Sequence, residues 1–140
     1  MSGTGPLSIK EFNELKKFSL EARNYSYSPY SNFRVGCAVL VEDGSFVQGA
    51  NVENASYGAG ICAERVAITR ALMENKNSFK AIGVSSDLDT TCSPCGICRQ
   101  FIREFSSDVP VYMFTAQGDH ELMTLTELLP NSFGPEHLNK

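Results

Sequence analysis

The spacing of apolar residues along the chain predicts helices and strands that alternate. Apolar side chains recur at helical intervals from Phe12 to Ala22, and Ser8 with Glu11 fits a capping box, so we expect a first helix over residues 8–25. Short runs rich in β-branched residues predict strands, and longer runs of helix-forming residues predict helices. In chain order these are a strand at 35–41, a strand at 46–52, a helix at 62–73, a strand at 81–85, a helix at 95–105 and a strand at 109–115.

The connecting segments complete the predicted fold. Residues 42–45 are a turn signal that joins the first two strands into a hairpin. The last part of the chain adds a turn at 117–119, a short strand near Glu121 and a short helix that ends before Pro130. This order predicts one α/β domain over residues 1–140, with a mixed sheet between helices in three layers. Residues 1–6 are small and polar, and we expect them to be frayed.

Composition and charge exclude several classes of protein. The 140 residues are 42% hydrophobic and 20% charged, which is typical of a globular domain with a core of its own. The net charge is −4 and the 12 Lys and Arg are scattered. No run of them could neutralise several adjacent phosphates, so we expect a long polynucleotide to be a poor partner. No apolar stretch approaches the roughly 20 residues that cross a membrane. The first residues lack the basic region and apolar run of a secretory signal, so we expect none. Five cysteines in such a chain indicate a reducing compartment, the cytoplasm or the nucleus.

The clearest chemistry lies in cysteines at the starts of two predicted helices. Cys95 and Cys98 are three positions apart on one helix face and can hold one metal ion, and Cys62 at the start of the other helix can complete a triad. A helix N-terminus favours thiolate over thiol. Three protein ligands leave the fourth tetrahedral position of zinc for water, which is the arrangement of a catalytic site. Glu64, close to Cys62, is placed to move a proton between that water and a leaving group.

Other interpretations of the cysteines remain open at this point. A Cys-x-x-Cys pair also occurs in redox proteins, usually after the first strand of a thioredoxin-like pattern, and in structural zinc sites. A structural site needs a fourth ligand, and His120 and His137 lack the spacing for it. We interpret Cys37, inside a predicted strand, as a buried core thiol. Cys92 is a candidate fourth ligand, but its loop position before Pro94 favours a bystander.

The two motifs together resemble the signature of zinc-dependent nucleoside and nucleobase deaminases, in its three-cysteine version. Residues 30–36, 51–57 and 128–135 are similar to segments of the small cytidine deaminases, so the resemblance covers nearly the whole chain. It implies the three-layer α/β/α fold of that family, with a mixed five-stranded sheet. It also implies the activity of a pyrimidine-salvage enzyme: hydrolysis of free cytidine and deoxycytidine to uridine and deoxyuridine, with release of ammonia.

The resemblance implies roles for the residues of both motifs. Cys62, Cys95 and Cys98 would hold one Zn²⁺ per subunit, and zinc would activate the water that attacks C4 of the pyrimidine. Glu64 would protonate N3 and then pass a proton to the departing amino group. Three thiolates outweigh the charge of Zn²⁺ by one unit, which opposes ionisation of that water. Arg65 matches the family residue whose cation hydrogen-bonds the sulfurs and reduces this penalty.

Further residues map onto family positions that bind the substrate. Asn51 and Glu53 match the residues that hydrogen-bond the ribose 3′-hydroxyl, a group that needs both an acceptor and a donor when buried. Phe33 matches a residue that lines the sugar and base pocket. The backbone N–H of Ala63 would meet the pyrimidine O2.

The family also implies an assembly. Its members of this kind are homotetramers whose active sites borrow residues from neighbouring subunits. Phe133 matches an aromatic residue that stacks on the base from another subunit. Tyr57 matches an active-site residue contributed across an interface.

Two rival functions follow from the same residues. A deaminase acting on cytosine in RNA or DNA needs a basic groove, and a polymer carries a phosphate on the 3′ oxygen that Glu53 would repel. A non-catalytic zinc module predicts four filled ligand positions and no need for Glu64. Asp87 and Asp89 lie in a predicted loop without a metal signature, and we interpret both as solvated.

Overall fold

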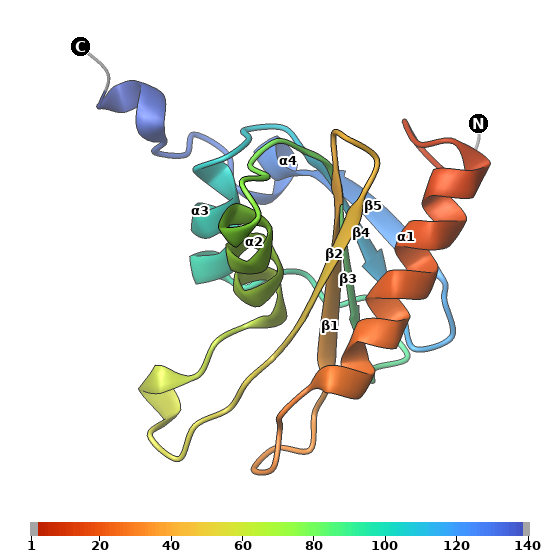
Figure 1. Ribbon diagram of the computed structural model, residues 1–140, viewed down its shortest axis with the longest axis vertical. Coiled ribbons are helices and arrows are strands. Elements are labelled where there is room, and N and C mark those ends of the chain that lie inside the picture. Colours follow the sequence, from red (N-terminus) through yellow and green to blue (C-terminus); the bar gives the residue numbers. More distant parts are fainter. Residues whose placement is uncertain (1–2, 139–140) are drawn as a thin grey trace.

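The structure, a computed structural model, describes residues 3–138 and contains one mixed sheet of five strands in the order β2-β1-β3-β4-β5 (Figure 1). The strands are β1 (Val35–Val41), β2 (Phe46–Ala50), β3 (Phe79–Ser86), β4 (Pro110–Phe114) and β5 (His120–Thr124). Neighbouring strands are antiparallel except β3 and β4, which are parallel. The predicted hairpin and the mixed five-stranded sheet are both confirmed.

Helices cover both faces of the sheet, which confirms the three predicted layers (Figure 1). One face carries α1 (Ile9–Ala22), and the other carries α2 (Ala63–Met73), α3 (Gly96–Arg103) and the short α4 (Leu125–Leu128). The described part of the chain also contains the single-turn 3₁₀ helices η1 (Arg23–Tyr25), η2 (Tyr57–Ala59) and η3 (Pro135–His137). Within residues 3–138, no helix is long and apolar enough to cross a membrane.

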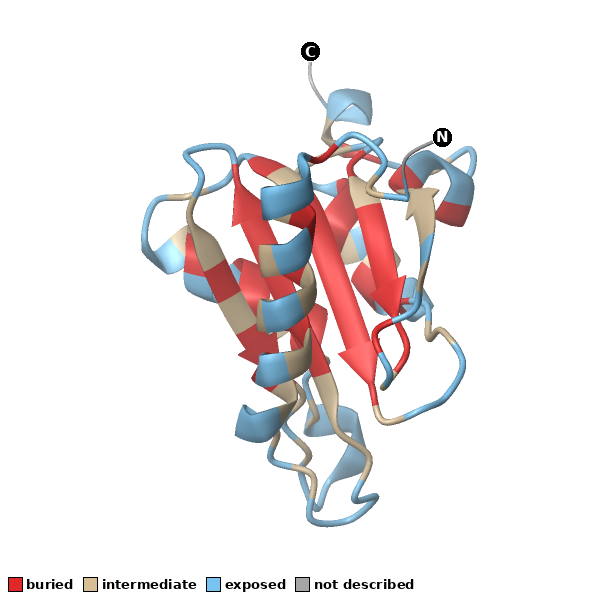
Figure 2. Ribbon diagram, turned by 90° about the vertical axis from the view of Figure 1, so that its right-hand side faces the viewer, coloured by how far each residue is buried: buried red, intermediate tan, exposed pale blue. Residues whose placement is uncertain are grey.

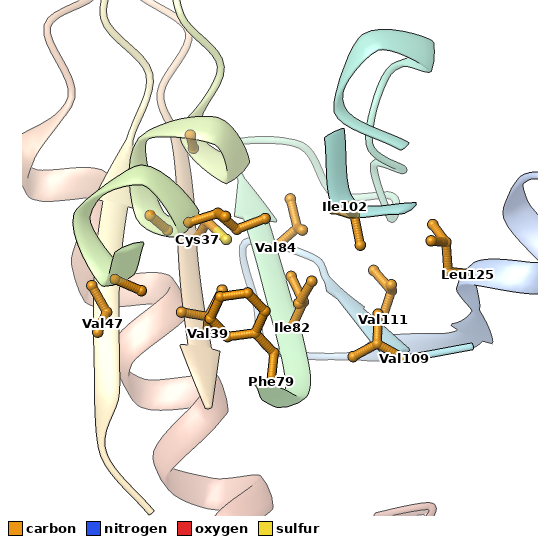
Figure 3. Packing of buried hydrophobic residues seen from close by; sticks show 14 of the residues in the cluster. Cys37, Val39, Val47, Phe79, Ile82, Val84, Ile102, Val109, Val111 and Leu125 are labelled. Atoms are coloured by element: carbon orange, nitrogen blue, oxygen red, sulfur yellow. The ribbon is translucent and has the colours of Figure 1, made fainter. Parts of the chain in front are cut away.

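Alternate residues of the strands divide the core into two apolar clusters, one on each side of the sheet. Cys37 and Val39 of β1 pack with Ile102 of α3 in the cluster that Figure 3 shows. Leu40 lies in the other cluster with Leu15 of α1. Figure 2 shows that the outer side of α1 is exposed, whereas the strands behind this helix are mostly buried. Cys37 is fully buried, as expected of a core thiol, and this burial raises its pKa.

Helix α2 lies directly on β2 because residue 49 is a glycine. A Cβ atom on Gly49 would stand 2.3 Å from the nitrogen of Ala67 and 2.6 Å from the carbonyl oxygen of Ala63, both in the backbone of α2. No side chain fits in that space. Since α2 begins at the predicted metal and proton-transfer residues, this close approach sets their distance from the sheet.

Two predicted strand boundaries are wrong by two residues, because side chains at these positions have distant partners. β3 begins at Phe79, two residues before the expected start, and the Lys80 that interrupts the apolar run pairs with Glu11 of α1 at 2.7 Å. The second strand ends at Ala50 instead of residue 52. There the amide oxygen of Asn51 accepts a hydrogen bond from the first backbone N–H of β1 at 3.0 Å, and the chain leaves the sheet.

The ends of the first and third helices also differ from prediction. The capping box at Ser8 is present, but the last expected turn, Arg23–Tyr25, is a 3₁₀ helix. Helix α3 stops at residue 103, two residues early. We expected residues 1–6 to be frayed, and residues 1 and 2 lie outside the described part of the chain. Residues 3–6 form a turn in which the Thr4 carbonyl accepts a hydrogen bond from the Tyr112 hydroxyl at 2.6 Å.

Candidate active site

The three cysteines of the two motifs meet at the starts of two helices. Cys62 is the N-cap residue of α2, Cys95 is the N-cap residue of α3, and Cys98 lies in the first turn of α3. Their Sγ atoms all lie within 4.8 Å of one another, and those of Cys62 and Cys95 are 3.8 Å apart. The fold therefore brings together the three predicted ligands.

The geometry and chemistry of the three sulfurs fit a zinc ion. Tetrahedral ligands with Zn–S bonds of about 2.3 Å lie about 3.8 Å from each other, and the sulfurs of Cys62 and Cys95 have this separation. The dipoles of both helices favour the thiolate forms at their N-termini, and thiolates are ligands that zinc prefers. The cluster supplies three protein ligands. A tetrahedral ion held here keeps one position for a small molecule.

Arg65 supplies positive charge to this cluster. Its Nη2 lies 3.7 Å from the Sγ of Cys62. Hydrogen bonds from Cys98 and then from Arg65 lower the pKa of Cys62, and the thiolates raise the pKa of Arg65. The Nε of Arg65 is buried and, within the described part of the chain, has no hydrogen-bond partner. The guanidinium is thus directed to the sulfurs, in agreement with the predicted compensation of their charge.

Glu64, the second residue of α2, is a buried acid next to the sulfur cluster. Its exposed fraction is 3%, and it lines the same cavity as Cys62 and Cys95. Burial raises the pKa of Glu64 to about 7, and the negative charge of Cys62 contributes in the same direction. A carboxyl group with this pKa can both accept and donate a proton near neutral pH.

A cavity of about 780 Å³ opens beside the sulfurs and Glu64. Most of its lining comes from residues 30–35, 51–65 and 92–97, three stretches that are far apart in the sequence. The volume is in the range of pockets that enclose small molecules. The cavity therefore has room for a ligand of nucleoside size.

Asn51 lines the cavity, but its side-chain amide forms most of its hydrogen bonds with other residues of the chain. Its Oδ1 accepts hydrogen bonds from Ser26 Oγ at 2.5 Å and from the nitrogen of Val35 at 3.0 Å. Its Nδ2 donates to the carbonyl oxygen of Phe33 at 3.0 Å. Among the contacts of the described residues, one N–H of Asn51 is left to donate to a ligand.

Glu53 is held at the same cavity by the loop that follows η1. Its Oε1 accepts hydrogen bonds from the backbone nitrogens of Tyr30 at 3.0 Å and Ser31 at 3.1 Å, and its Oε2 accepts one from the Ser31 hydroxyl. The Ser31 hydroxyl is the main cause that lowers the pKa of Glu53. Glu53 is therefore an oriented, ionised acceptor. Sequence analysis did not single out Ser31, because its contact joins residues 22 positions apart.

Ala63 and Tyr57 also lie at the cavity. Ala63 is the first residue of α2, so its backbone N–H has no acceptor inside the helix. Tyr57 in η2 is 83% exposed and packs edge-on against the ring of Tyr30, with 6.4 Å between centroids. Tyr57 thus reaches the cavity of its own chain, and its predicted contribution across an interface stays a prediction.

The structure does not bring Phe33 and Phe133 to the cavity of their own chain. Neither is among the described residues that line it. Phe33 is half-buried, and its backbone is held by Ser31 and Asn51. Phe133 is 56% exposed, and its carbonyl oxygen accepts a hydrogen bond from Gln100 of α3. Their substrate contacts remain predictions.

The interpretation of Asp87 as a solvated residue is wrong. Arg34 donates to its carboxylate from Nη2 at 2.8 Å and from the backbone nitrogen at 3.0 Å, and Arg23 lies 3.4 Å away. The hydrogen bonds from Arg34 lower the pKa of Asp87. This network ties the end of β3 to the loop that carries Glu53's anchors. No local pattern reveals it, because Arg34 and Asp87 are 53 positions apart.

Cys92 lies in the cavity wall but outside the three-sulfur cluster. It is half-buried, and burial, followed by the charge of Glu64, raises its pKa. The structure agrees with its interpretation as a bystander.

Comparison with known proteins identifies the family. Residues 10–114 match the family described as "Cytidine and deoxycytidylate deaminase zinc-binding region". A cytidine deaminase of Halalkalibacterium halodurans is 45% identical over 126 residues, which are 89% of this chain and 96% of that protein. A probable cytidine deaminase of Dictyostelium discoideum is also 45% identical, over 89% of this chain and 87% of its own.

Solved structures agree with the sequence relatives. The crystal structure of cytidine deaminase from Burkholderia pseudomallei has a TM-score of 0.84 and 40% sequence identity, and the match covers 86% of this chain and 98% of that chain. The cytidine deaminase of Mycobacterium tuberculosis has a TM-score of 0.77 at 35% identity, over 88% and 97% of the two chains. The present chain therefore belongs to the family of zinc-binding cytidine and deoxycytidylate deaminases, with the α/β/α fold of that family.

Proposed function

We propose that this protein catalyses the zinc-dependent hydrolysis of cytidine and deoxycytidine to uridine and deoxyuridine, with release of ammonia. The observation that carries the proposal is the buried carboxyl group of Glu64, which lies beside three clustered thiols at a cavity of nucleoside size. A structural zinc site is closed by four protein ligands, so it requires neither a buried acid nor an adjacent cavity. The family assignment supports the same reaction class.

Each part of the reaction has a residue suited to it. Cys62, Cys95 and Cys98 would hold the zinc ion, whose chemistry when bound would be to activate a water molecule as the nucleophile. Glu64 would take a proton from the attacking water and deliver it to N3 of the pyrimidine. It would then take the proton of the hydroxyl newly formed at C4 and pass it to the amino group, so that the C4–N bond breaks and ammonia leaves. Arg65 offsets the excess negative charge of the three thiolates.

The sugar of a free nucleoside would be recognised by the polar residues at the cavity. Glu53 accepts a hydrogen bond from the 3′-hydroxyl, and Asn51 uses its remaining N–H to donate to the same oxygen. The backbone N–H of Ala63 donates to O2 of the base. The ionised Glu53 disfavours a phosphate on the 3′ oxygen, so free nucleosides are preferred over RNA and DNA.

The active enzyme is a homotetramer in the cytoplasm, with active sites completed by neighbouring subunits. Phe133 is exposed and away from the cavity of its own chain, which supports a contact with the base bound by a neighbour. Tyr57, Tyr30, Ile61 and Ile97 are exposed apolar side chains at the cavity, and they are suited to burial against another subunit.

The test is to incubate the purified protein with cytidine and to follow the loss of ultraviolet absorbance as the amino group leaves, with zinc measured per chain. We expect turnover by the native protein and a kcat lower by roughly 100- to 10,000-fold in Glu64→Gln, with zinc retained. Glu21→Gln, an exposed acid on α1, is the control and should match the native protein.

Three outcomes would overturn the proposal. An active Glu64→Gln would remove the carboxyl from proton transfer. Deamination of RNA or DNA without turnover of nucleosides would favour a polymer-editing enzyme. A zinc-loaded protein without turnover, with a fourth protein ligand on the metal, would favour a zinc module.

A further inference from the structure

Helix α3 holds the end of α4 and the segment that follows it by hydrogen bonds from three of its side chains. Arg99 Nη1 donates to the carbonyl oxygen of Leu128 at 2.6 Å, and Gln100 Nε2 donates to the carbonyl oxygen of Phe133 at 2.9 Å. Arg103 Nε donates to the hydroxyl of residue 132 at 2.7 Å. The helix that begins at two metal ligands therefore also anchors the backbone around Phe133.

Arg103 is the central contact of this anchor. Its side chain is 8% exposed, an uncommon state for an arginine, and it forms an ion pair with Glu136. Gly134 lies directly on the guanidinium: a Cβ atom there would stand 2.1 Å from Nη1. Residues on both sides of Phe133 thus contact one buried cation, which fixes the path of the chain through Phe133.

The anchored segment presents an aromatic ring to the outside. Phe133 is 56% exposed, and its ring stacks on that of His137, with 5.3 Å between centroids and 18° between planes. A ring held from its backbone and from one face has lost much of its conformational freedom before any ligand binds. Such preorganisation lowers the entropic cost of a contact with a binding partner.

The ring cannot serve the cavity of its own chain in this arrangement. Phe133 is not among the described residues that line that cavity. Figures 1 and 2 both draw η3, which follows Phe133, at the end of the molecule opposite to the loop that carries η2, a wall of the cavity. In the homotetramer of the proposed function, the ring would instead meet the active site of a second copy of the chain.

We infer that Arg103 is a positioning residue that sets Phe133 for the base bound in a neighbouring subunit. The inference rests on the proposed function, in which Phe133 contacts the base. Arg103 does not touch the substrate itself. It acts through Gly134, Glu136 and the hydroxyl of residue 132, and its effect appears in a different subunit from the one that carries it.

The first test compares steady-state constants for cytidine in Arg103→Ala, Arg103→Lys and Gly134→Ala. Aromatic stacking on a base makes a large contribution to binding, so a misplaced ring should raise KM by about fivefold or more while kcat and zinc content stay within about twofold. The lysine keeps the charge and should restore part of the loss. Gly134→Ala displaces the same guanidinium from the other side and should reproduce the higher KM. Arg70→Ala, an exposed arginine on α2, is the control.

The second test mixes subunits of Arg103→Ala with subunits of Glu64→Gln. The latter have no catalytic acid but present Phe133 correctly. If Phe133 acts on a neighbouring subunit, some active sites of Arg103→Ala subunits in the mixed oligomers receive a correctly placed Phe133 from a Glu64→Gln subunit. Those active sites should turn over cytidine with the native KM. If every active site in the mixed oligomers keeps the high KM, the proposed contact of Phe133 with the base in a neighbouring subunit is wrong.

Failure of this inference is distinct from failure of the proposed function. A native protein that does not deaminate cytidine refutes the proposed function. An active native protein whose KM rises with Phe133→Ala, but not with Arg103→Ala or Gly134→Ala, refutes only the role of Arg103. Should Arg103→Ala not fold, Arg103→Lys and Gly134→Ala decide the matter by the same criterion.

Discussion

Glu53→Gln tests the proposed sugar contact with little disturbance of the surrounding loop. The native carboxylate accepts two backbone hydrogen bonds on Oε1, from Tyr30 and Ser31, and one from the Ser31 hydroxyl on Oε2. A glutamine carbonyl can accept both backbone bonds, and its amide can donate to the Ser31 oxygen, which also has acceptor capacity. The substitution therefore keeps the side chain in place and removes a charge and an acceptor.

The size of the effect follows from what is lost. A hydrogen bond to an ionised acceptor is stronger than one between neutral groups, and its loss lowers kcat/KM by roughly 10- to 100-fold. We expect this loss for cytidine, mainly in KM, because the 3′-hydroxyl takes no part in the chemical step. With 3′-deoxycytidine, which lacks that hydroxyl, the native enzyme and Glu53→Gln should agree within about threefold.

The assay is the change in ultraviolet absorbance on deamination, recorded for both nucleosides with both proteins. Zinc content and the urea midpoint of unfolding show whether the site and the fold survive the substitution. Glu74→Gln, an exposed acid at the end of α2, is the matched control. Equal losses on cytidine and 3′-deoxycytidine would refute the contact between Glu53 and the sugar.

Three further predictions address the metal, the packing and the pH dependence of stability. Cys95→Ala should lower bound zinc far below one per chain and abolish deamination; metal analysis that still finds one zinc per chain would contradict its role as a ligand. Gly49→Ala should lower the free energy of unfolding by about 3 kcal/mol, because the new Cβ overlaps the α2 backbone. Gly58→Ala, where nothing lies within 4 Å, should leave the urea midpoint unchanged. Asp87→Asn should lower stability by about 1 kcal/mol at pH 7. The Arg34 contact lowers the folded-state pKa of Asp87, so its contribution is complete above the unfolded pKa of about 3.9 and is lost as the pH falls through the folded value. The difference in unfolding midpoint between native protein and Asp87→Asn should therefore vanish in acid, and a constant difference down to pH 2 would contradict the ion pair.

Local features of the fold were predictable because their causes lie within a few residues. The capping box of α1 needs only Ser8 and Glu11, and the hairpin of β1 and β2 needs only its turn and two β-rich runs. The early start of β3 and the departure of Asn51 from β2 were not predictable. Lys80 and Asn51 depend on partners in α1 and β1, and propensity contains no information about them.

Residue type and short spacing were sufficient to identify the chemistry: cysteines at helix starts, an acid two positions from one of them, and paired motifs in a fixed order. Ligand preference and helix geometry are local physics, so the order of amino acids alone specifies them. The 3.8 Å between the sulfurs of Cys62 and Cys95, the burial that raises the pKa of Glu64, and the distance of Phe133 from its own cavity have another origin. They arise from the packing of elements separated by tens of residues, and only the assembled core brings those elements into contact.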